Sequence, residues 1–277
     1  MTIAQADSKE LTAQLSSLEA DFAALKARGL SLDLTRGKPA PEQLALSEAL
    51  DGILDGDFTS PGGTDVRNYG GIDGLAELRA LFGELYDLSP EETLIGGNSS
   101  LQLMYLTLDF ALNHGFDGPG SAWRDRGEVK FLCPSPGYDR HFAVCEHLGI
   151  DMIAVPMLDT GPDMDAVEAL VREDRSIRGM WCVPRFSNPT GCVYSDETVE
   201  RIAKLGKLAA DGFIVMWDNA YAVHALYDDA PALASIRDYA VQHGTEDNVL
   251  QFGSTSKVTF ASAGVAFLAT SPDNLAA

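Results

Sequence analysis

Six short apolar runs, each bounded by polar residues, constrain the fold of this chain more than any other feature. They lie at residues 129–133, 151–155, 179–183, 213–217, 248–252 and 265–270. Helical patterns such as "DMDAVEALVRE" and "SDETVERIAKLGKLAADG" separate several of them. Strands that are apolar throughout and joined by helices form parallel sheets with both faces covered. The sequence therefore predicts an α/β fold with a mainly parallel sheet sandwiched by helices.

The part of the chain before these runs predicts three helices. In residues 8–28 the apolar side chains recur at alternating spacings of four and three, and Gly29 follows: Leu11, Leu15, Leu18, Phe22 and Leu25. This is an amphipathic helix. Residues 74–88 are also helical in period, and residues 99–112 are apolar on nearly every face, which predicts a buried helix. We expect an N-terminal helix and arm over residues 1–45 and a large domain over 46–277.

Composition excludes several classes of protein. The chain has 277 residues, of which 45% are hydrophobic and 22% charged, as in globular domains. The formal net charge of −21 argues against nucleic-acid and anionic-membrane partners. There is no apolar segment typical of a signal peptide or of a membrane span. The isolated cysteines predict reduced thiols in a cytoplasmic protein: Cys133, Cys145, Cys182 and Cys192.

Polar and ionisable residues directly follow four of the apolar runs. "PSPGYD" follows 129–133, "PRFSNPTG" follows 179–183, "DNAY" follows 213–217 and "GSTSK" follows 248–252. In parallel sheets, ligands bind beyond the carboxyl ends of the strands. We therefore expect one site at that edge of the sheet, built from Tyr138, Asn188, Asp218, Tyr221, Ser254, Ser256 and Lys257.

Lys257 and Asp218 each allow two interpretations. A lysine can pack its stem on the sheet and place its amine in solvent. In a partly desolvated cleft it instead becomes a nucleophile that forms a Schiff base. A carboxylate at the end of a buried strand, such as Asp218, needs a cation or strong donors. It could cap a following helix, or it could pair with a protonated ring nitrogen.

The remaining residues are weaker signals when taken singly. Tyr138 and Tyr221 could be ordinary packing residues, and Asn188 in "SNPTG" could be a turn residue. In "IGGNSSLQLM" two glycines precede polar residues that open the predicted helix 99–112. The free amides and dipole of a helix N-terminus bind anions, and hydroxyls after the run 248–252 suit the same ligand. The anion-site residues would be Asn98, Ser99, Ser100, Ser254 and Ser256.

Taken together, these motifs resemble the fold-type I pyridoxal-phosphate enzymes, specifically the class I aminotransferases. The motifs that carry the resemblance occur in the order of the family: "RGKP" (36–39), "NYGG" (68–71), "GGNSSL" (96–101), "PSPGYD", "SNPTG", "WDNAY" and "STSK". Longer stretches such as "LTRGKP" and "STSKVTFASAGVAF" look most like the bacterial class Ic aspartate aminotransferase branch. The resemblance implies pyridoxal 5′-phosphate as cofactor and transfer of an amino group from L-aspartate to 2-oxoglutarate.

The resemblance also implies a role for each residue. Lys257 would form the Schiff base with the cofactor and later shuttle a proton, and Asp218 would keep the ring nitrogen protonated. Asn188 and Tyr221 would hydrogen-bond the 3′-oxygen of the ring, and Tyr138 would stack on its face.

Further roles concern the phosphate, the substrate and the partner subunit. The amides of residues 98–100, with Ser254 and Ser256, would hold the phosphate. Tyr69 would reach the phosphate of a neighbouring subunit, which implies a homodimer. Gly37 would lie near the substrate carboxylate, as would Asn188. The resemblance implies no metal.

The chain departs from the family pattern in two ways. The stretch "VTFASAGVAF" after Lys257 lacks the arginine that many aminotransferases direct at the phosphate, and Arg185 is one candidate to replace it. The chain ends at "SPDNLAA", where family members continue through the rest of the large domain and a C-terminal small domain. We therefore expect this small domain to be missing, apolar surface to be exposed, and the chain alone to be impaired in turnover.

Three other functions remain open at this stage. Ser254 to Lys257 fits the S-x-x-K motif of penicillin-binding proteins, although S-D-N and K-T-G are absent and that motif opens a helix. A shortened relative could bind the cofactor without transamination. A cofactor-dependent lyase would use the same residues with a different pocket.

Overall fold

The computed structural model describes residues 7–32 and 39–277. The chain divides into two compact units, residues 1–43 and 44–277. Helix α1 (Ser8–Ala27) makes up most of the first unit, and α2 (Pro41–Ala45) spans the division between them. Gly37, which the sequence places near a substrate carboxylate, lies outside the described residues.

Helix α1 forms where the apolar spacing predicts it. The Asp7 carboxylate accepts from the backbone N–H groups of Lys9 and Glu10, each at 2.8 Å, and the Glu10 carboxylate accepts from the Asp7 N–H at 3.0 Å. This reciprocal capping box satisfies donors that a helix start otherwise leaves free. The apolar stripe of α1 is exposed, from 37% for Leu11 to 65% for Leu18. The helix itself is confirmed.

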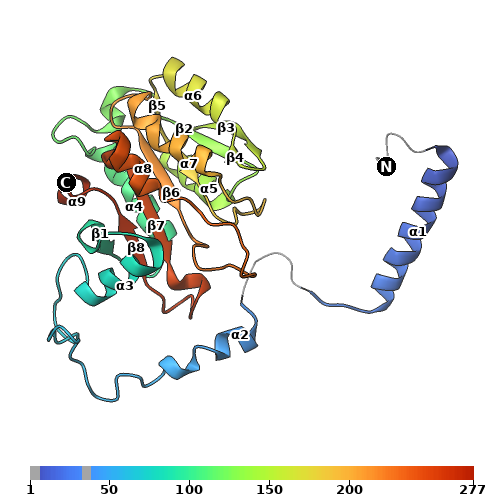
Figure 1. The fold of residues 1–277 in the computed structure, drawn as a ribbon, viewed down its shortest axis with the longest axis horizontal. Coiled ribbons are helices and arrows are strands. Elements are labelled where there is room, and N and C mark those ends of the chain that lie inside the picture. Colours follow the sequence, from blue (N-terminus) through green and yellow to red (C-terminus); the bar gives the residue numbers. More distant parts are fainter. Residues whose placement is uncertain (1–6, 33–38) are drawn as a thin grey trace. The chain divides into compact units, whose positions relative to one another are not determined.

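An eight-stranded mixed sheet forms the centre of the second unit (Figure 1). Its strands lie in the order β1-β8-β7-β6-β5-β2-β3-β4. Their bounds are β1 Thr93–Ile95, β2 Lys130–Ser135, β3 Asp151–Leu158, β4 Gly161–Pro162, β5 Ile177–Cys182, β6 Ile214–Asp218, β7 Val249–Ser254 and β8 Ala266–Ala269. The pairs β2–β3, β2–β5, β5–β6 and β6–β7 are parallel. The pairs β1–β8, β7–β8 and β3–β4 are antiparallel.

The predicted α/β fold class is therefore confirmed. All six apolar runs contribute strands, and the four consecutive pairs in the middle of the sheet are parallel. Strands β1 and β4 were not predicted from the sequence. They contain three and two residues, too few for an apolar pattern to develop.

Helices cover both faces of this sheet. Their bounds are α3 Ala76–Tyr86, α4 Ser100–Asn113, α5 Asp139–Leu148, α6 Met164–Glu173, α7 Asp196–Ala203, α8 Ile236–His243 and α9 Pro272–Ala276. Short 3₁₀ helices complete the unit: η2 Glu48–Leu50, η3 Pro90–Glu92, η4 Trp123–Arg126, η5 Lys204–Lys207, η6 Glu246–Asn248 and η7 Thr255–Lys257. One core lies beneath α4 and α5, and a second beneath α6, α7 and α8. A third, smaller core joins α3 to β8.

Alternation along the central strands determines which side chains reach each core. Successive residues of a strand point to opposite faces. Trp181 and Met216 belong to the core beneath α4 and α5, whereas Cys182 and Trp217 belong to the core beneath α6 to α8. Asp218, which follows Trp217, is therefore directed to the face that α5 covers.

Helix α4 differs from its prediction as a fully buried helix. Its buried residues form one face: Met104, Thr107, Leu108, Ala111 and Leu112. Leu106, in contrast, is 49% exposed. The apolar composition of the segment exceeds what one face of the sheet can cover.

The cysteines are free, as predicted. Cys133, Cys145 and Cys182 are buried, and Cys192 is only half-buried.

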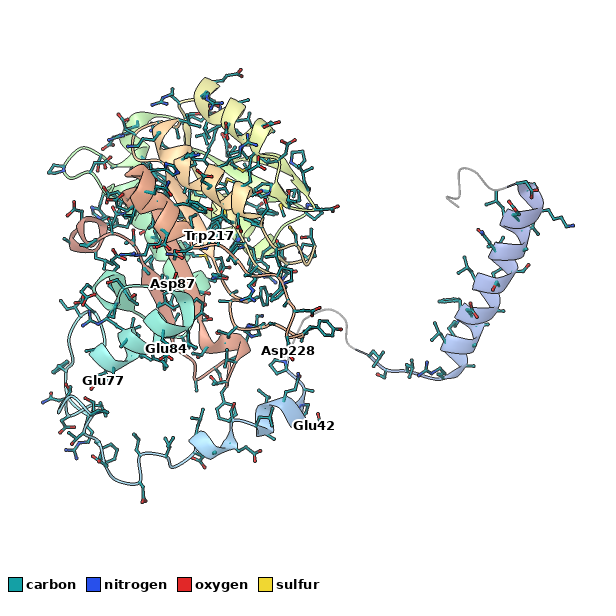
Figure 2. All side chains as sticks on the ribbon, viewed as in Figure 1. Glu42, Glu77, Glu84, Asp87, Trp217 and Asp228 are labelled. Atoms are coloured by element: carbon teal, nitrogen blue, oxygen red, sulfur yellow. The ribbon has the colours of Figure 1, made fainter. Side chains whose placement is uncertain are left out.

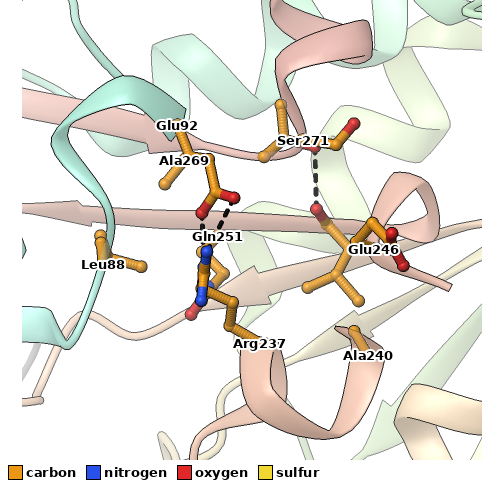
Figure 3. A pocket seen from close by; sticks show the side chains of 10 residues that line it. Leu88, Glu92, Arg237, Ala240, Glu246, Gln251, Ala269 and Ser271 are labelled. Atoms are coloured by element: carbon orange, nitrogen blue, oxygen red, sulfur yellow. Dashed lines mark hydrogen bonds and ion pairs between the residues drawn. The ribbon is translucent and has the colours of Figure 1, made fainter. Parts of the chain in front are cut away.

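A bidentate ion pair ties α8 to η3 at the edge of the sheet where β7 begins (Figure 3). Arg237 Nη2 donates to Glu92 Oε1 at 2.8 Å, and Arg237 Nε contacts Glu92 Oε2. This pairing raises the pKa of Arg237. The small pocket beside it is lined by Val249 and Ala269 and lies away from the carboxyl ends of the parallel strands.

The burial pattern of α4 predicts the cost of shortening its leucines. Leu108→Ala should lower the free energy of unfolding by about 2–5 kcal/mol, because the side chain is fully buried beneath the helix. Leu106→Ala on the same helix should change it by about 0.5 kcal/mol or less. Urea unfolding monitored by circular dichroism measures both. Equal losses would contradict the assigned orientation of α4.

Candidate active site

The carboxyl ends of β2, β5, β6 and β7 bring most of the predicted residues to one edge of the sheet. Asp218 ends β6 and pairs in register with Phe252 of β7, and Ser254 ends β7. Tyr138 caps the start of α5 just after β2, and Asn188 lies in the loop after β5. The prediction that these segments converge is confirmed by the strand order.

Asp218 is the most deeply buried charged group of this edge. Its residue exposure is 4%, and its Oδ2 lies 3.0 Å from His141 Nε2. Its Oδ1 is buried and has no hydrogen-bond partner among the described residues. Leaving such an acceptor without a donor costs about 1–3 kcal/mol, and more for a charged group. Asp218 caps no helix, because the next helix, α8, is capped by Ser235.

His141, the partner of Asp218, was missed by the sequence analysis. It is buried in the first turn of α5, and its ring stacks on Trp181 with centroids 4.2 Å apart and an 8° interplanar angle. Tyr138 meets the same imidazole edge-on at 5.0 Å. The available signal was spacing, because His141 shares a buried stripe with Val144 and Cys145, three and four residues later.

A buried cysteine side chain contacts Trp181 and holds the indole in place. Its indole N–H donates to Cys145 Sγ at 3.2 Å. The buried Cys145 thiol also hydrogen-bonds Cys133, and this contact raises the pKa of Cys133 while it lowers that of Cys145. The imidazole that contacts Asp218 therefore rests on a fully packed layer.

Tyr221 and Asn188 contact each other at the same edge. Burial raises the pKa of Tyr221, nearby Asp218 and Tyr138 raise it further, and a side-chain hydrogen bond with Asn188 opposes these effects. The phenol therefore stays protonated at neutral pH and can donate a hydrogen bond. The amide of Asn188 supplies a second polar group beside it.

Lys257 is exposed, whereas one interpretation of the sequence placed its amine in a partly desolvated cleft. It ends the 3₁₀ turn η7, and its Nζ lies 5.9 Å from the centroid of the Tyr221 ring. A long, flexible stem lets a lysine follow an aromatic surface while its amine reaches water. Its backbone carbonyl accepts a hydrogen bond from His224 Nε2 at 3.1 Å.

The predicted anion-site residues come from two loops that are tied together. Ser256 Oγ donates to the Asn98 carbonyl, and Asn98 Nδ2 donates to the Ser262 carbonyl, both at 3.2 Å. Ser99 caps α4, so Ser100 begins the helix. Ser254 is buried and its Oγ accepts from the Ser256 N–H at 3.4 Å. The contacts thus place the hydroxyls after β7 beside the N-terminus of α4.

Gly97 allows this approach because its φ of +58° lies in the left-handed region that other residues avoid. A side chain with a Cβ at this position would strain the turn into α4. The backbone conformation at Gly97 therefore explains why the second residue of "GGNSS" is glycine.

Two predicted residues do not join this cluster. Arg185 donates to the main-chain carbonyls of Ala222 and, at 3.4 Å, Pro231. It therefore supports the segment after Tyr221, and the idea that it meets a phosphate receives no support. Tyr69 is fully exposed at 101%, and in the described part of the chain no side-chain hydrogen bond joins it to the site residues.

A cavity of about 190 Å³ is lined by residues of α3, of the end of β6 and of the start of α8. Glu84, Asp87 and Trp217, labelled in Figure 2, line it together with Arg185 and Asn219. The described residues include no group of three or more His, Cys, Asp or Glu side chains that could hold a metal ion. Nor do they include a helix with the length and apolar composition needed to cross a membrane.

Comparison with known proteins decides the family. Residues 6–277 match the family model described as aspartate amino-transferase. The chain belongs to this family. A protein of Mycolicibacterium smegmatis is 48% identical over 96% of the chain, and the aspartate aminotransferase of Corynebacterium glutamicum is 44% identical over 91%. The family predicted from the motifs is thereby confirmed.

A solved structure supports the fold independently. The crystal structure of an aspartate transaminase from C. glutamicum covers 100% of the chain with a TM-score of 0.90 and 41% identity. The chain spans 65% of that structure, and 63% and 58% of the two relatives above. It therefore spans less than two thirds of the length of each of them.

The charge of Asp218 predicts how two phenols of this aminotransferase-family chain titrate. Burial and then Asp218 raise the pKa of Tyr86 to about 12, and burial and Asp218 also raise that of Tyr221. Asp218→Asn removes a negative charge that disfavours phenolate, so both pKa values should fall. Tyrosinate absorbance should therefore develop at lower pH.

The same substitution should change alkaline stability. A phenol whose folded pKa is raised contributes stability that is present below its ordinary pKa of 10.0 and is lost as pH rises through the folded value. The loss between pH 10 and about 12 should be smaller in Asp218→Asn. The exposed Asp196→Asn is the control and should titrate as the wild type does. An unchanged titration of Asp218→Asn would contradict this electrostatic coupling.

Proposed function

We propose that this protein is a pyridoxal-phosphate-dependent aminotransferase that moves an amino group from L-aspartate to 2-oxoglutarate. The observation that carries the proposal is the buried Asp218, whose Oδ1 has no donor within the described part of the chain while its Oδ2 contacts His141. An aromatic N–H⁺ is the kind of donor that such an oxygen requires. The names of relatives that share the family support the reaction class.

The donors and acceptors at this edge match the chemistry of pyridoxal phosphate. Asp218 Oδ1 offers an acceptor for the ring nitrogen, and Tyr221 with Asn188 offers donors for the oxygen on the ring. The tied loops around the N-terminus of α4 offer amides and hydroxyls for the phosphate. Tyr138 offers an aromatic surface beside His141.

The proposed mechanism assigns one task to each side chain. When bound, the cofactor supplies an electron sink for the carbanion at the substrate α-carbon. Lys257 is the residue that would hold the cofactor through its aldehyde, and its amine would carry a proton to and from the substrate α-carbon. Asp218 holds a proton on the ring nitrogen, and His141 orients Asp218 through Oδ2. The raised pKa of Tyr221 keeps its phenol protonated, so that the phenol can donate a hydrogen bond to the ring oxygen.

Further parts of the proposal concern substrate, assembly and location. We propose that Asn188 lies near the substrate carboxylate and that Tyr69 reaches the site of a homodimer partner. The full exposure of Tyr69, at 101%, and of Ile72, at 92%, supports a partner surface in that segment. We also propose a domain boundary between residues 45 and 46, which separates an N-terminal helix and arm from the large domain. The four free cysteines support a cytoplasmic location.

Labelling of Lys257 tests the proposed function. The chain should bind pyridoxal phosphate with visible absorption, and borohydride should then attach the cofactor irreversibly to Lys257, because its amine is the nucleophile at this edge. Peptide mapping by mass spectrometry identifies the labelled residue. Lys257→Ala should lose the label, and Lys207→Ala, which removes another lysine, should keep it.

The reaction itself is checked with L-aspartate and 2-oxoglutarate by measuring oxaloacetate. Asp218→Ala should keep part of the cofactor binding and lose roughly a hundredfold or more in kcat, since it removes the charge that stabilises the reacting state. A label on any residue other than Lys257 would refute the assignment. Label at Lys257 with release of ammonia and no amino transfer to 2-oxoglutarate would indicate a lyase, and label without product would indicate a cofactor-binding relative.

A further inference from the structure

His224 is a half-buried histidine that the sequence did not predict as a site residue. It follows Tyr221 by three residues, and its backbone N–H donates to the Tyr221 carbonyl at 3.1 Å, which closes a turn. Its ring meets that of Tyr221 edge-on, with centroids 5.8 Å apart and an 84° interplanar angle. Its Nε2 lies 3.1 Å from the Lys257 carbonyl. One side chain thus contacts both Tyr221 and Lys257.

The chemistry of the contact fixes the tautomer of His224. A carbonyl oxygen can only accept, so Nε2 carries the hydrogen that it donates to Lys257. In the neutral ring Nδ1 is then an acceptor. This Nδ1 is buried and has no partner among the described residues. The ring is therefore oriented by its Nε2–H bond and by Tyr221.

The Lys257 carbonyl needs such a donor because of its place in the chain. It ends η7, a 3₁₀ turn of three residues, and the last carbonyls of a helical turn lack internal partners. Histidine side chains can satisfy carbonyls at that position. The turn itself is closed by the N–H groups of Val258 and Thr259, which donate to the Thr255 carbonyl at 2.8 and 2.9 Å.

The segment that carries His224 is held independently of Lys257. Arg185 donates to the carbonyls of Ala222 and Pro231, on either side of His224. The Ala222 N–H also donates to the Asn219 carbonyl at 3.3 Å. His224 therefore extends from a braced segment to the end of η7.

We infer that His224 is a positioning residue that fixes the main chain at Lys257 while the lysine side chain stays free to move. This inference rests on the proposed function of Lys257. A nucleophile that must bond the cofactor and then carry a proton needs a fixed Cα and a mobile amine, and its Nζ already lies over Tyr221 at 5.9 Å. The hydrogen bond, and not the bulk of the ring, supplies the constraint.

Two substitutions separate the hydrogen bond from ring packing. His224→Phe keeps an aromatic edge against Tyr221 and removes the donor, whereas His224→Gln places an amide N–H near the position of Nε2. The control is His243→Phe, since His243 lies on α8 and contacts Glu200 on α7 at 3.3 Å. If His224→Phe does not fold, His224→Leu replaces it.

Amide hydrogen exchange in the chain without added cofactor gives the first readout. Exchange at Val258 and Thr259 should be about three- to tenfold faster in His224→Phe, the effect expected for losing one hydrogen bond. His224→Gln and His243→Phe should exchange at the wild-type rate. Wild-type exchange in His224→Phe, or equally fast exchange in His224→Gln, would overturn the inference.

Steady-state kinetics with pyridoxal phosphate and amino-acid substrate give the second readout. His224→Phe should lower kcat by about ten- to hundredfold with KM little changed, and His224→Gln should restore most of it. Borohydride labelling of the wild type separates the two proposals. Label at Lys257 with unaltered exchange and kinetics in His224→Phe removes only the positioning role. Absence of label at Lys257 removes the proposed function and with it that role, even if the exchange effect is found.

Discussion

The organisation of this edge of the sheet depends on one buried carboxylate. Asp218 ends a strand that is buried throughout, and within residues 7–32 and 39–277 only one of its oxygens has a partner, His141 Nε2 at 3.0 Å. Removing a carboxylate from water is costly unless donors replace the lost hydration. The protein keeps the group by packing its partner imidazole against Trp181. The second oxygen is buried and receives no hydrogen bond from the residues that the structure describes.

The sheet places the other groups around this carboxylate. Parallel neighbours end together, so the loops after β2, β5, β6 and β7 share one edge. Alternation then sorts their side chains: Trp217 packs beneath α6 to α8, and Asp218 faces α5. Hydrogen bonds between the loop at Asn98 and the loop at Ser256 join the start of α4 to the end of β7. The N-terminus of α4 and the loop that carries Lys257 thus come from distant segments to one place.

The repeated apolar pattern predicted the strands and the edge of the sheet that holds the site. It did not predict the roles of the individual histidines at that edge. The apolar runs identified the strands, and the residues after them identified the edge where Asp218, Tyr221 and Lys257 lie. His141 and His224 were missed because their roles depend on contacts with residues distant in sequence; the spacing that puts His141 on a buried stripe does not identify Asp218 as its partner. The exposure of Lys257 could not be predicted either, since a long side chain follows whichever surface the fold provides.

Dependence on contacts that are distant in sequence also explains the smaller differences between the predicted and the observed structure. Strand β1 pairs only with β8, which begins more than 170 residues later in the chain, and its three residues carry no pattern of their own. The apolar sequence of α4 indicated burial on every side, although the sheet covers one face and leaves Leu106 half-exposed. The sequence offered Arg185 as a candidate to bind the phosphate, but in the fold its guanidinium donates to main-chain carbonyls.

The central claim is that the free oxygen of Asp218 meets a protonated ring nitrogen. Nuclear magnetic resonance of the chain loaded with pyridoxal phosphate, labelled with nitrogen-15 in the ring, measures this most directly. At neutral pH the wild type should give the signal of a protonated pyridine nitrogen, and Asp218→Ala should give that of a neutral one. A neutral nitrogen in the wild type, or the same signal in both proteins, would contradict the claim.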